Sequence, residues 1–577
     1  MRKLLLSTSL ILFSLCASAA LSGQWQWTKV LNAGDAVMSN IDAVVPAAGG
    51  NYFIAGNFSK STTLAWGDVN VAPSDAMTFA YQKNFMVALI DAEGNLKWHV
   101  VPTMANTANN SISLAPTPDG GVVMACNATF NSNKGADAPL LMTLTGTDGK
   151  AVSLKYEGTP ADKAPYAGVI LKFSGDGAVE WGTVVTADCY GDADLTAFDA
   201  NALSVNDVAV DGEGNIFIGG YYKTTVDFGN GVTAPKALNG NVKDGKVADN
   251  GDAFIAKFGA DGKAVKVLVN GGSAPYASKE FMSRMAVSGG KLYCAGIVNG
   301  LAGAAYSLFG KSCEISDEVS TNIVYGVVDC ATLECESANA LKSTVTDDNK
   351  THNAQIQAMN LSGSHLYICG SLQGGFEQDG SSLGVSTAIY QATGKYALEN
   401  MTVAVDLDDL KAVRLYLSGK AIGNDYLAIE SAVAGRLYTY GYVMGENSCS
   451  LTGYDIASGE PADETLLWKN ASNLRAAYFN NDTKQLLGTC YSKGLTDIFG
   501  TDAATDSYAS FHGFLTSVSL PDLSVSSGVE EVAEGGVSEA DANAEYYNLQ
   551  GQRIENPLSG TIVIRQCGAT AEKIVVR

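Results

Sequence analysis

Residues 211–220 read Asp-Gly-Glu-Gly-Asn-Ile-Phe-Ile-Gly-Gly: an acidic turn, a short apolar run and a pair of small residues. Glycine in such a turn supplies the positive φ of a tight hairpin, and the apolar run predicts a buried β-strand. The pattern recurs along the chain, so an internal repeat is the first feature to explain. Its seven copies close at residues 56, 126, 220, 296, 370, 441 and 490.

Each copy belongs to a longer unit of four predicted strands. A short apolar strand precedes the copy, as in residues 207–210, and a third strand, a turn and a fourth strand follow, as in 85–90, 91–95 and 96–98. Near-continuous apolar strands indicate sheets that are covered on both faces. Seven units of four strands predict an all-β fold, a seven-bladed β-propeller.

The two ends of the repeat array complement each other. The last unit, residues 474–523, has three predicted strands and lacks a fourth. Residues 25–31 form an orphan strand that is similar to the fourth strands at 96–98 and 179–181. We therefore expect the N-terminal strand to complete the last blade and close the ring, which removes an exposed sheet edge.

The repeat also carries a family resemblance. Residues 211–220, 226–229 and 252–258 together resemble the bacterial secreted seven-bladed β-propeller repeat family. The match is best in this third unit, fair in the first two and weak in the last three. The resemblance implies the fold and secretion, and it brings no shared catalytic residue to this chain.

The first 19 residues predict a signal peptide. Arg2 and Lys3 precede an apolar run over 4–15, and Ala17-Ser18-Ala19 provides a cleavage site. A lipoprotein signal at Cys16 is disfavoured because the residue before it is Leu15 rather than a small residue. No later segment is apolar over the length that a transmembrane helix needs. We expect residues 20–523 to form the propeller of a secreted or outer-membrane surface protein.

The composition changes after the last repeat. Residues 524–545 are small and acidic, which predicts a linker. Residues 546–577 resemble the C-terminal sorting segments of Bacteroidetes proteins exported by the type IX system, which implies the export machinery as a partner. A small β-module that packs on the propeller is the alternative for this tail. The residues that carry the resemblance are Tyr547, Leu549, Gly551, Arg553 and Gly560.

Composition restricts the chemistry. The formal net charge of −23 over 577 residues argues against nucleic acid as a partner, because phosphate backbones are bound by clustered Lys and Arg. None of the four histidines lies beside a G-x-S-x-G elbow, and the acidic turns at 91–94 and 211–214 are better explained as hairpins than as calcium loops. We predict no catalytic residue, metal or cofactor, and the sequence does not identify the ligand-binding residues. The four histidines, His99, His352, His365 and His512, have no metal-ligand spacing.

The cysteines are not spaced like a disulfide scaffold. Four of them lie in apolar strands, where a small buried side chain is expected. Cys330 and Cys335 flank a predicted turn and are close enough in sequence for a local disulfide. The four expected to be buried are Cys126, Cys294, Cys369 and Cys490.

These observations predict a non-catalytic module that binds a glycan or a protein. The connections between second and third strands are long and share one rim, which we expect to be the ligand-binding face. Their aromatic residues either form a platform for the ligand or, as is commoner, pack inside their own loops. The alternatives are a polysaccharide-acting enzyme with a carboxylate pair and a structural scaffold of the cell envelope. These aromatics are Trp66, Tyr81, Tyr156, Tyr221, Tyr222, Tyr390 and Tyr491.

Overall fold

The computed structural model describes most of the chain between residues 21 and 575. The signal peptide and most of the linker predicted from the sequence lie outside the described residues. The described ranges are 21–34, 37–59, 63–71, 83–103, 107–129, 140–156, 166–188, 202–237, 242–243, 246–247, 251–270, 280–299, 306–316, 321–345, 352–390, 393–431, 435–524, 545–547, 553–554, 562–567 and 570–575.

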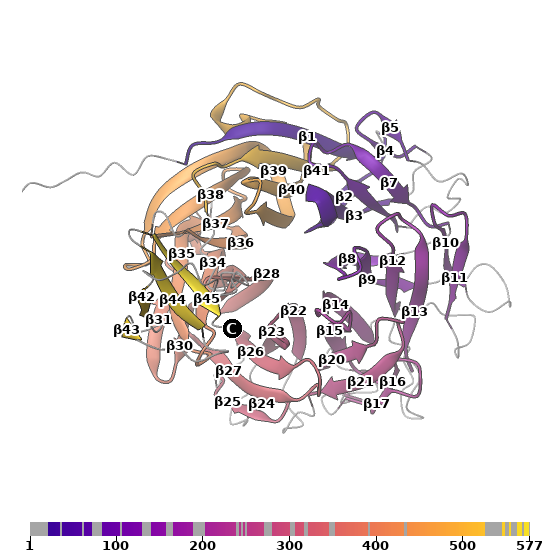
Figure 1. The fold of residues 1–577 in the computed structure, drawn as a ribbon, viewed down its shortest axis with the longest axis horizontal. Helices are drawn as coiled ribbons and strands as arrows, with labels where there is room; N and C mark the ends of the chain where they lie inside the picture. Colours follow the sequence, from indigo (N-terminus) through magenta and orange to yellow (C-terminus); the bar gives the residue numbers. More distant parts are fainter. Residues whose placement is uncertain are drawn as a thin grey trace, which may run out of the picture.

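The fold is an all-β propeller, in which antiparallel sheets are arranged around a central axis (Figure 1). Five sheets each contain one blade of four strands, and we name each blade by its innermost strand. They are β2 (Ser39–Pro46), β3 (Tyr52–Ser59), β6 (Lys83–Ile90) and β7 (Leu96–Val100); β8 (Thr107–Pro116), β9 (Val122–Thr129), β12 (Tyr166–Phe173) and β13 (Val179–Ala187); β14 (Leu203–Val210), β15 (Ile216–Tyr222), β20 (Asp252–Phe258) and β21 (Ala264–Val269); β22 (Glu280–Ser288), β23 (Lys291–Asn299), β26 (Thr321–Asp329) and β27 (Cys335–Thr344); and β28 (Asn353–Ser362), β29 (His365–Gln373), β34 (Glu399–Asp406) and β35 (Ala412–Ala421).

The sixth sheet of the propeller differs from the prediction of seven separate blades. Its nine strands are continuous because β39 pairs with β38 over Pro461–Lys469 and with β40 over Lys469–Asn480. Asn470 adopts a positive φ of 63°, so the strand bends there without leaving the sheet. In order, the strands are β36 (Gly423–Ser431), β37 (Arg436–Val443), β38 (Ser448–Asp455), β39 (Pro461–Asn480), β40 (Gln485–Thr496), β41 (His512–Ser519), β1 (Gln24–Asn32), β4 (Ala65–Trp66) and β5 (Val69–Asn70).

The N-terminal strand pairs as the sequence predicts. β1 lies antiparallel to β41, with Gln24 opposite Ser519 and Leu31 opposite Gly513. Contacts between innermost strands run from β2 through β8, β14, β22, β28, β36 and β39 and back to β2. Apolar side chains fill the space between successive sheets, as where Phe53 and Leu89 share one cluster with Val169.

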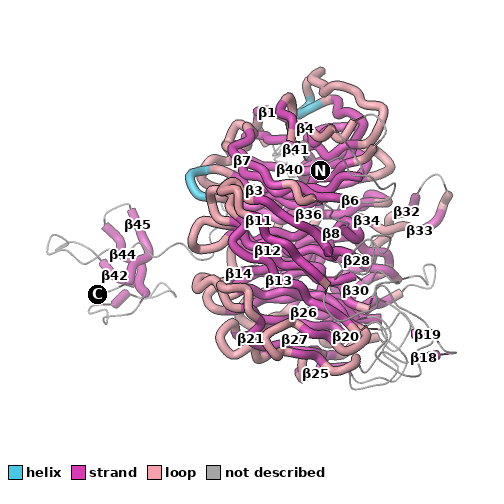
Figure 2. The backbone as a smooth tube through the Cα atoms, turned by 90° about the vertical axis from the view of Figure 1, so that its right-hand side faces the viewer, coloured by secondary structure: helices cyan, strands magenta, loops and turns pink. Residues whose placement is uncertain are grey.

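Not all of the long connections stay on one rim in the described structure, because the hairpin over 140–155 reaches the opposite turns, where the Thr147 N–H donates to the Gly177 carbonyl at 3.1 Å. Figure 2 shows the hairpins β18–β19 and β32–β33 on one side of the propeller, away from the short connection that follows β2. The remaining hairpins and short helices are β10 (Leu140–Thr145) with β11 (Ala151–Lys155), β16 (Val226–Asp227) with β17 (Thr233–Ala234), β18 (Val242–Lys243) with β19 (Lys246–Val247), β24 (Tyr306–Leu308) with β25 (Lys311–Cys313), β30 (Gly375–Gln378) with β31 (Ser381–Val385), β32 (Ile389–Tyr390) with β33 (Lys395–Tyr396), η1 (Ala48–Gly50) and η2 (Ile498–Gly500).

Neighbouring blades are joined by a repeated hydrogen bond, which we call a clasp. A side chain on the outermost strand of one blade donates to a backbone carbonyl in the third-to-fourth-strand turn of the next. Because the same contact recurs around the propeller, it marks equivalent positions in successive blades. The clasps join Trp27 to Ala92 (2.8 Å), Trp98 to Gly175 (2.8 Å), Trp181 to Ala260 (3.1 Å), Lys266 to Thr332 (2.7 Å), Asn339 to Leu410 (3.2 Å) and Arg414 to Ser458 (2.8 Å).

The cysteines of the described propeller are free thiols. The four expected to be buried are buried. Cys330 and Cys335 are also free and buried, so the local disulfide that their spacing allowed is absent from the structure. The turn between them is closed by backbone hydrogen bonds instead, and the Cys335 thiol points to the Ser337 carbonyl on its own strand, 3.5 Å away.

The C-terminal tail forms a four-stranded sheet of its own, with Tyr547 opposite Arg553. The other residues of the predicted sorting segment, Leu549, Gly551 and Gly560, lie outside the described residues. No helix in the described part of the chain has the length and apolar character needed to cross a membrane. The tail strands are β42 (Glu545–Tyr547), β43 (Arg553–Ile554), β44 (Ile562–Cys567) and β45 (Thr570–Val575).

Candidate functional site in the axial channel

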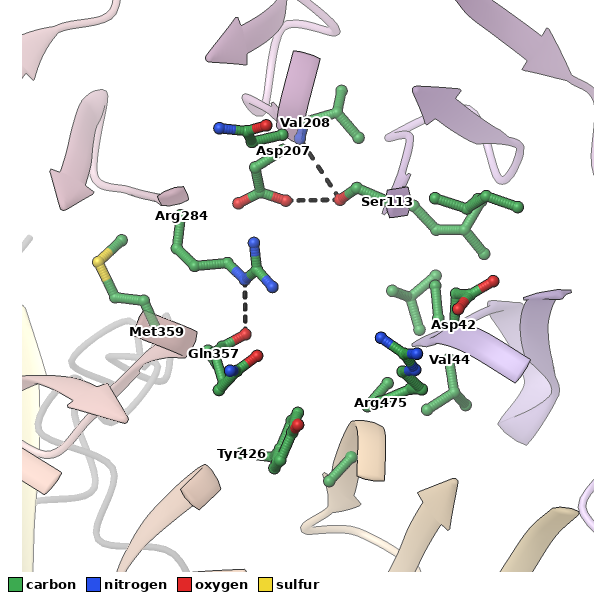
Figure 3. A pocket seen from close by; sticks show the side chains of 18 of the residues that line it. Asp42, Val44, Ser113, Asp207, Val208, Arg284, Gln357, Met359, Tyr426 and Arg475 are labelled. Carbon is green, nitrogen blue, oxygen red and sulfur yellow. Dashed lines mark hydrogen bonds between the residues drawn. The ribbon is translucent and has the colours of Figure 1, made fainter. Parts of the chain in front are cut away.

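A cavity of about 260 Å³ lies at the centre of the propeller. Every innermost strand contributes to its lining: β2, β8, β14, β22, β28, β36 and β39. Small and aliphatic residues form much of the wall, and charged or amide side chains from different blades converge on the axis (Figure 3). A concave site on which polar side chains from several elements converge is a candidate for ligand binding.

β-Bulges place the polar groups in this cavity. In the inner strands the pairing with the second strand skips one or two residues near the middle of the strand. A bulge leaves the extra residue unpaired and redirects side chains, so bulges are common beside binding sites. The lining residues at the bulges or directly after them are Asp42, Asn206, Asp207, Arg284, Gln357, Tyr426 and Arg475.

One half of the channel is held by hydrogen bonds between blades. The Asp207 carboxylate accepts one from the Ser113 hydroxyl (2.5 Å) and one from the Met285 backbone N–H (2.7 Å). Arg284 Nε donates to the Gln357 carbonyl at 2.7 Å, and its Nη1 donates to the Ser283 carbonyl at 2.6 Å. The Asp207 and Arg284 side chains are therefore fixed in position.

The other half holds polar groups without such partners. Asp42 accepts a hydrogen bond from Asn57 through Oδ2, whereas its buried Oδ1 has no partner in the described structure. Arg475 lies on the same side of the cavity, and its buried Nε also lacks a partner among the described residues. Two buried polar atoms in one cavity therefore have unused hydrogen-bonding capacity, which is costly unless a ligand or water meets it.

Burial sets the charge of the two channel carboxyls. Desolvation raises the pKa of Asp42 to about 7, although the nearby Arg475 guanidinium opposes this shift. Burial also raises the pKa of Asp207, with Arg284 opposing it. A carboxyl with a pKa near 7 is about half ionised at neutral pH, so it offsets about half of one arginine charge in the channel.

Two further cavities lie between blades. One of about 580 Å³ lies between the β2 and β8 blades and includes Trp98 and Lys97 in its wall. One of about 120 Å³ lies between the β8 and β14 blades and includes Lys172. Short turns border both cavities. Because the two cavities lie at successive blade interfaces, we interpret them as a consequence of how the blades pack. The axial cavity is different because it brings residues from all the innermost strands together.

The loop aromatics do not form one exposed platform in the described structure. Trp66, Tyr156 and Tyr222 are buried, and the first two donate hydrogen bonds to backbone carbonyls at 2.9 Å and 2.8 Å. The partners of these three residues lie outside their own loops, since Trp66 donates to Gly94, Tyr156 donates to Ala187 and Tyr222 packs on Phe254, so burial is as expected but packing within the own loop is not. Tyr81 lies outside the described residues.

Sequence reasoning did not identify Arg284 or Arg475. Both lie in predicted inner strands, where a charged residue interrupts an apolar run. A comparison of the seven units position by position would have aligned the polar residue of each inner strand. A single unit shows only one polar residue in its inner strand. Because the residues that share the cavity lie in different blades, one unit alone does not reveal the site.

These features define the protein as a β-propeller with a polar axial cavity. No family model matches the chain, and no curated protein matches it. Solved structures resemble it only distantly. They include the quinohemoprotein alcohol dehydrogenase ADHIIG of Pseudomonas putida HK5 (11% identity, 90% of this chain and 80% of that chain, TM-score 0.37), the Dos1 propeller (12%, 86% and 96%, 0.37) and the periplasmic gluconolactonase PpgL of Pseudomonas aeruginosa (12%, 66% and 90%, 0.28). At this level of similarity they carry no argument about function.

Proposed function

We propose that this protein is an exported, non-catalytic binding protein whose ligand enters the axial channel. The observation that carries the proposal is the cavity itself, in which arginine and amide groups from several blades converge on a space large enough for a small molecule. The alternative location for the ligand is the rim that carries the long loops.

The chemistry near the cavity favours binding over nucleophilic catalysis. The Ser39 hydroxyl lies 3.4 Å from His512 Nδ1, but both side chains are buried and neither lines the cavity. A nucleophile must reach its substrate, so this pair does not fit a hydrolytic role in the channel.

One observation favours a second candidate, a polysaccharide-acting enzyme. Asp42 and Asp207 both line the cavity, and the raised pKa of Asp42 resembles that of a general acid, whereas Asp207 accepts two hydrogen bonds. Two carboxyls in different environments are the pattern that glycosidases use. A scaffold of the cell envelope is the remaining alternative.

A glycan array combined with activity assays on complex polysaccharides tests the proposal. Binding without turnover is the expected result, and turnover that is lost in Asp42→Asn would establish the enzyme instead. Silence on every glycan and polysaccharide would favour the scaffold. Shortening the connection between Thr129 and Tyr166 distinguishes the two proposed locations, because it should weaken binding on the rim and spare binding in the channel.

We further propose that the nine-stranded sheet represents two blades that share β39, which gives seven blades in all, with β1 closing the ring. The pairing of β1 with β41 and the Trp27 clasp on the β2 blade support this interpretation. Deletion of residues 20–32 should then lower the thermal stability of the whole propeller. Unchanged thermal unfolding of the deletion variant would contradict closure by β1.

Export through a signal peptide in residues 1–19, membership of the secreted propeller family and recognition of the tail by a type IX system remain proposals from the sequence. Fractionation of the native host, with and without residues 546–577, tests them. Retention of the full-length protein in the cytoplasm would exclude export, and unchanged export without the tail would exclude a sorting role.

A further inference from the structure

We propose that the axial channel binds a small sugar carboxylate, held through the guanidinium groups of Arg284 and Arg475. This inference rests on the proposed binding function and names the class of ligand. A planar guanidinium with free N–H groups binds a carboxylate in a two-point geometry that a neutral sugar cannot reproduce. The two arginines come from β22 and β39, so only the folded propeller brings them to one cavity.

The unused hydrogen-bonding capacity of the channel points to this ligand. Arg284 uses Nε and Nη1 to bind backbone carbonyls, which orients its fork and leaves Nη2 without a described partner. Arg475 makes no hydrogen bond or ion pair with any described residue, and its Nε is buried. Since a buried guanidinium N–H without a partner is unfavourable, the site is incomplete without an acceptor.

The cavity holds two arginines and two carboxyls, so its formal charges balance, and an anion would depend on the guanidinium N–H groups that the carboxyls leave unpaired. Its two arginines face two carboxyls, of which Asp207 is occupied by Ser113 and Met285. Neither carboxyl lies within ion-pair distance of an arginine in the described structure. Burial raises the pKa of Asp42 to about 7, so about half of its population is neutral at that pH and does not offset the Arg475 charge.

The rest of the lining fits a small polyhydroxylated body. Asn206, Gln357 and Tyr426 share the lining of the cavity with aliphatic residues such as Val44 and Met359. Amide groups can bind sugar hydroxyls, and the aliphatic wall can cover the apolar faces of a ring. The volume of about 260 Å³ is slightly below the range of about 300–1,000 Å³ typical of drug-sized ligands, which favours a single sugar unit.

Titration calorimetry on the full mature chain tests the inference with four probes. D-glucuronate and D-galacturonate represent the free acid, an oligogalacturonate represents the same group at the end of a glycan, and D-glucose is the neutral control. We expect at least one uronate probe to bind at least tenfold more tightly than glucose. Preference for the oligosaccharide would identify a glycan end as the source, and preference for the monosaccharide would identify a free acid.

Variants then test the named residues. Arg475→Gln should weaken uronate binding at least tenfold, and Arg475→Lys should retain part of the affinity because it keeps the charge without the fork. The matched control is Lys411→Gln, which removes an exposed charge paired with Asp379 outside the cavity and should leave binding unchanged. Thermal unfolding of each variant establishes that the propeller is intact.

Several outcomes would overturn the inference. Equal binding of glucose and the uronates, no uronate binding to folded protein, or full affinity in Arg475→Gln would each do so. Binding of a neutral glycan on the array without uronate binding would overturn the carboxylate site and leave the binding function intact. Turnover of a uronate-containing glycan whose affinity falls in Arg475→Gln would contradict the non-catalytic function and support the site.

Discussion

Neighbouring blades are joined by tryptophan clasps in one arc of the propeller and by polar or charged clasps in another. In the tryptophan arc the clasps come from β1, β7 and β13, and each indole packs over the turn glycine of the next blade. In the polar arc the clasps come from β21, β27 and β35. The first arc uses Trp27, Trp98 and Trp181 over Gly94, Gly177 and Gly262, and the second uses Lys266, Asn339 and Arg414.

The turns differ along with the clasps. Gly94, Gly177 and Gly262 all have positive φ, and a Cβ added to any of them would meet an indole ring at 2.9 Å or less. In the polar arc two turns carry leucine at the corresponding position, with φ of 52° at Leu333 and 55° at Leu410. Both leucine side chains are buried. Burial therefore offsets backbone strain at two turns of the polar arc, whereas glycine avoids the strain at Gly459 in its third turn and throughout the tryptophan arc, where it also makes room for the indole.

The largest contrast should come from removing the clasp side chains. Trp98 contacts Phe53 and Phe173 besides its clasp, so Trp98→Ala should lower the free energy of unfolding by about 3 kcal/mol. Lys266 is exposed, so Lys266→Ala should change it by less than about 0.5 kcal/mol. Urea denaturation measures both values. Equal effects would show that the clasp hydrogen bond, rather than the indole packing, joins the blades.

A smaller loss is expected from the turn beneath the indole. Gly177→Ala forces an alanine into positive φ and places its Cβ 2.7 Å from the Trp98 ring, which should cost about 2 kcal/mol. Gly120→Ala is a matched control, because that glycine also has positive φ but has open space around it. The difference between the two free energies of unfolding measures the crowding that Trp98 and Thr147 impose on the added Cβ. No difference would mean that backbone strain alone explains the glycine.

Replacing the leucine at positive φ should destabilise the protein, although relief of backbone strain alone would stabilise it. Leu333→Gly relieves the positive φ but exposes the space that the buried side chain fills, so a net loss of about 1–2 kcal/mol is expected. The same denaturation experiment checks it. A stabilised variant would show that strain, and not burial, dominates this position.

The last contrast concerns pH, and here two distant strands should behave alike. Burial raises the pKa of Asp42 in β2 and of Asp425 in β36 from the ordinary 3.8 to about 7. Between these values the folded state binds more protons than the unfolded state, so stability falls as the pH rises from about 4 to about 7. Asp42→Asn and Asp425→Asn should each flatten the pH dependence of the thermal midpoint.

The exposed turn residue Asp176 supplies the control for this measurement, since Asp176→Asn should leave the profile unchanged. If the thermal midpoint of the wild type rises over the same pH interval, groups other than these two carboxyls must dominate the pH dependence. If the midpoint of both buried variants follows the same pH profile as the wild type, neither carboxyl titrates in that interval.

Much of the fold follows from short stretches of sequence. Residues 211–220 specify a turn and a strand through local backbone preferences, and the recurrence of that stretch indicates a propeller. The likeness of residues 25–31 to other fourth strands predicts the pairing of β1 with β41 because equivalent blades need equivalent outer strands. These features depend on residues close together in the chain, so the sequence by itself determined them.

Tertiary structure decided how the strands are divided among sheets and which residues line the channel. β39 joins β38 to β40 in one sheet because the chain bends at Asn470 without a break in pairing, although Asn470, Ser472 and Asn473 are residue types that favour a turn. Arg284 and Arg475 meet only because each inner strand contributes a short segment to the axis. The bulges determine which side chains of the inner strands face the channel. Which of these side chains then share one cavity depends on the assembled ring and not on any single repeat.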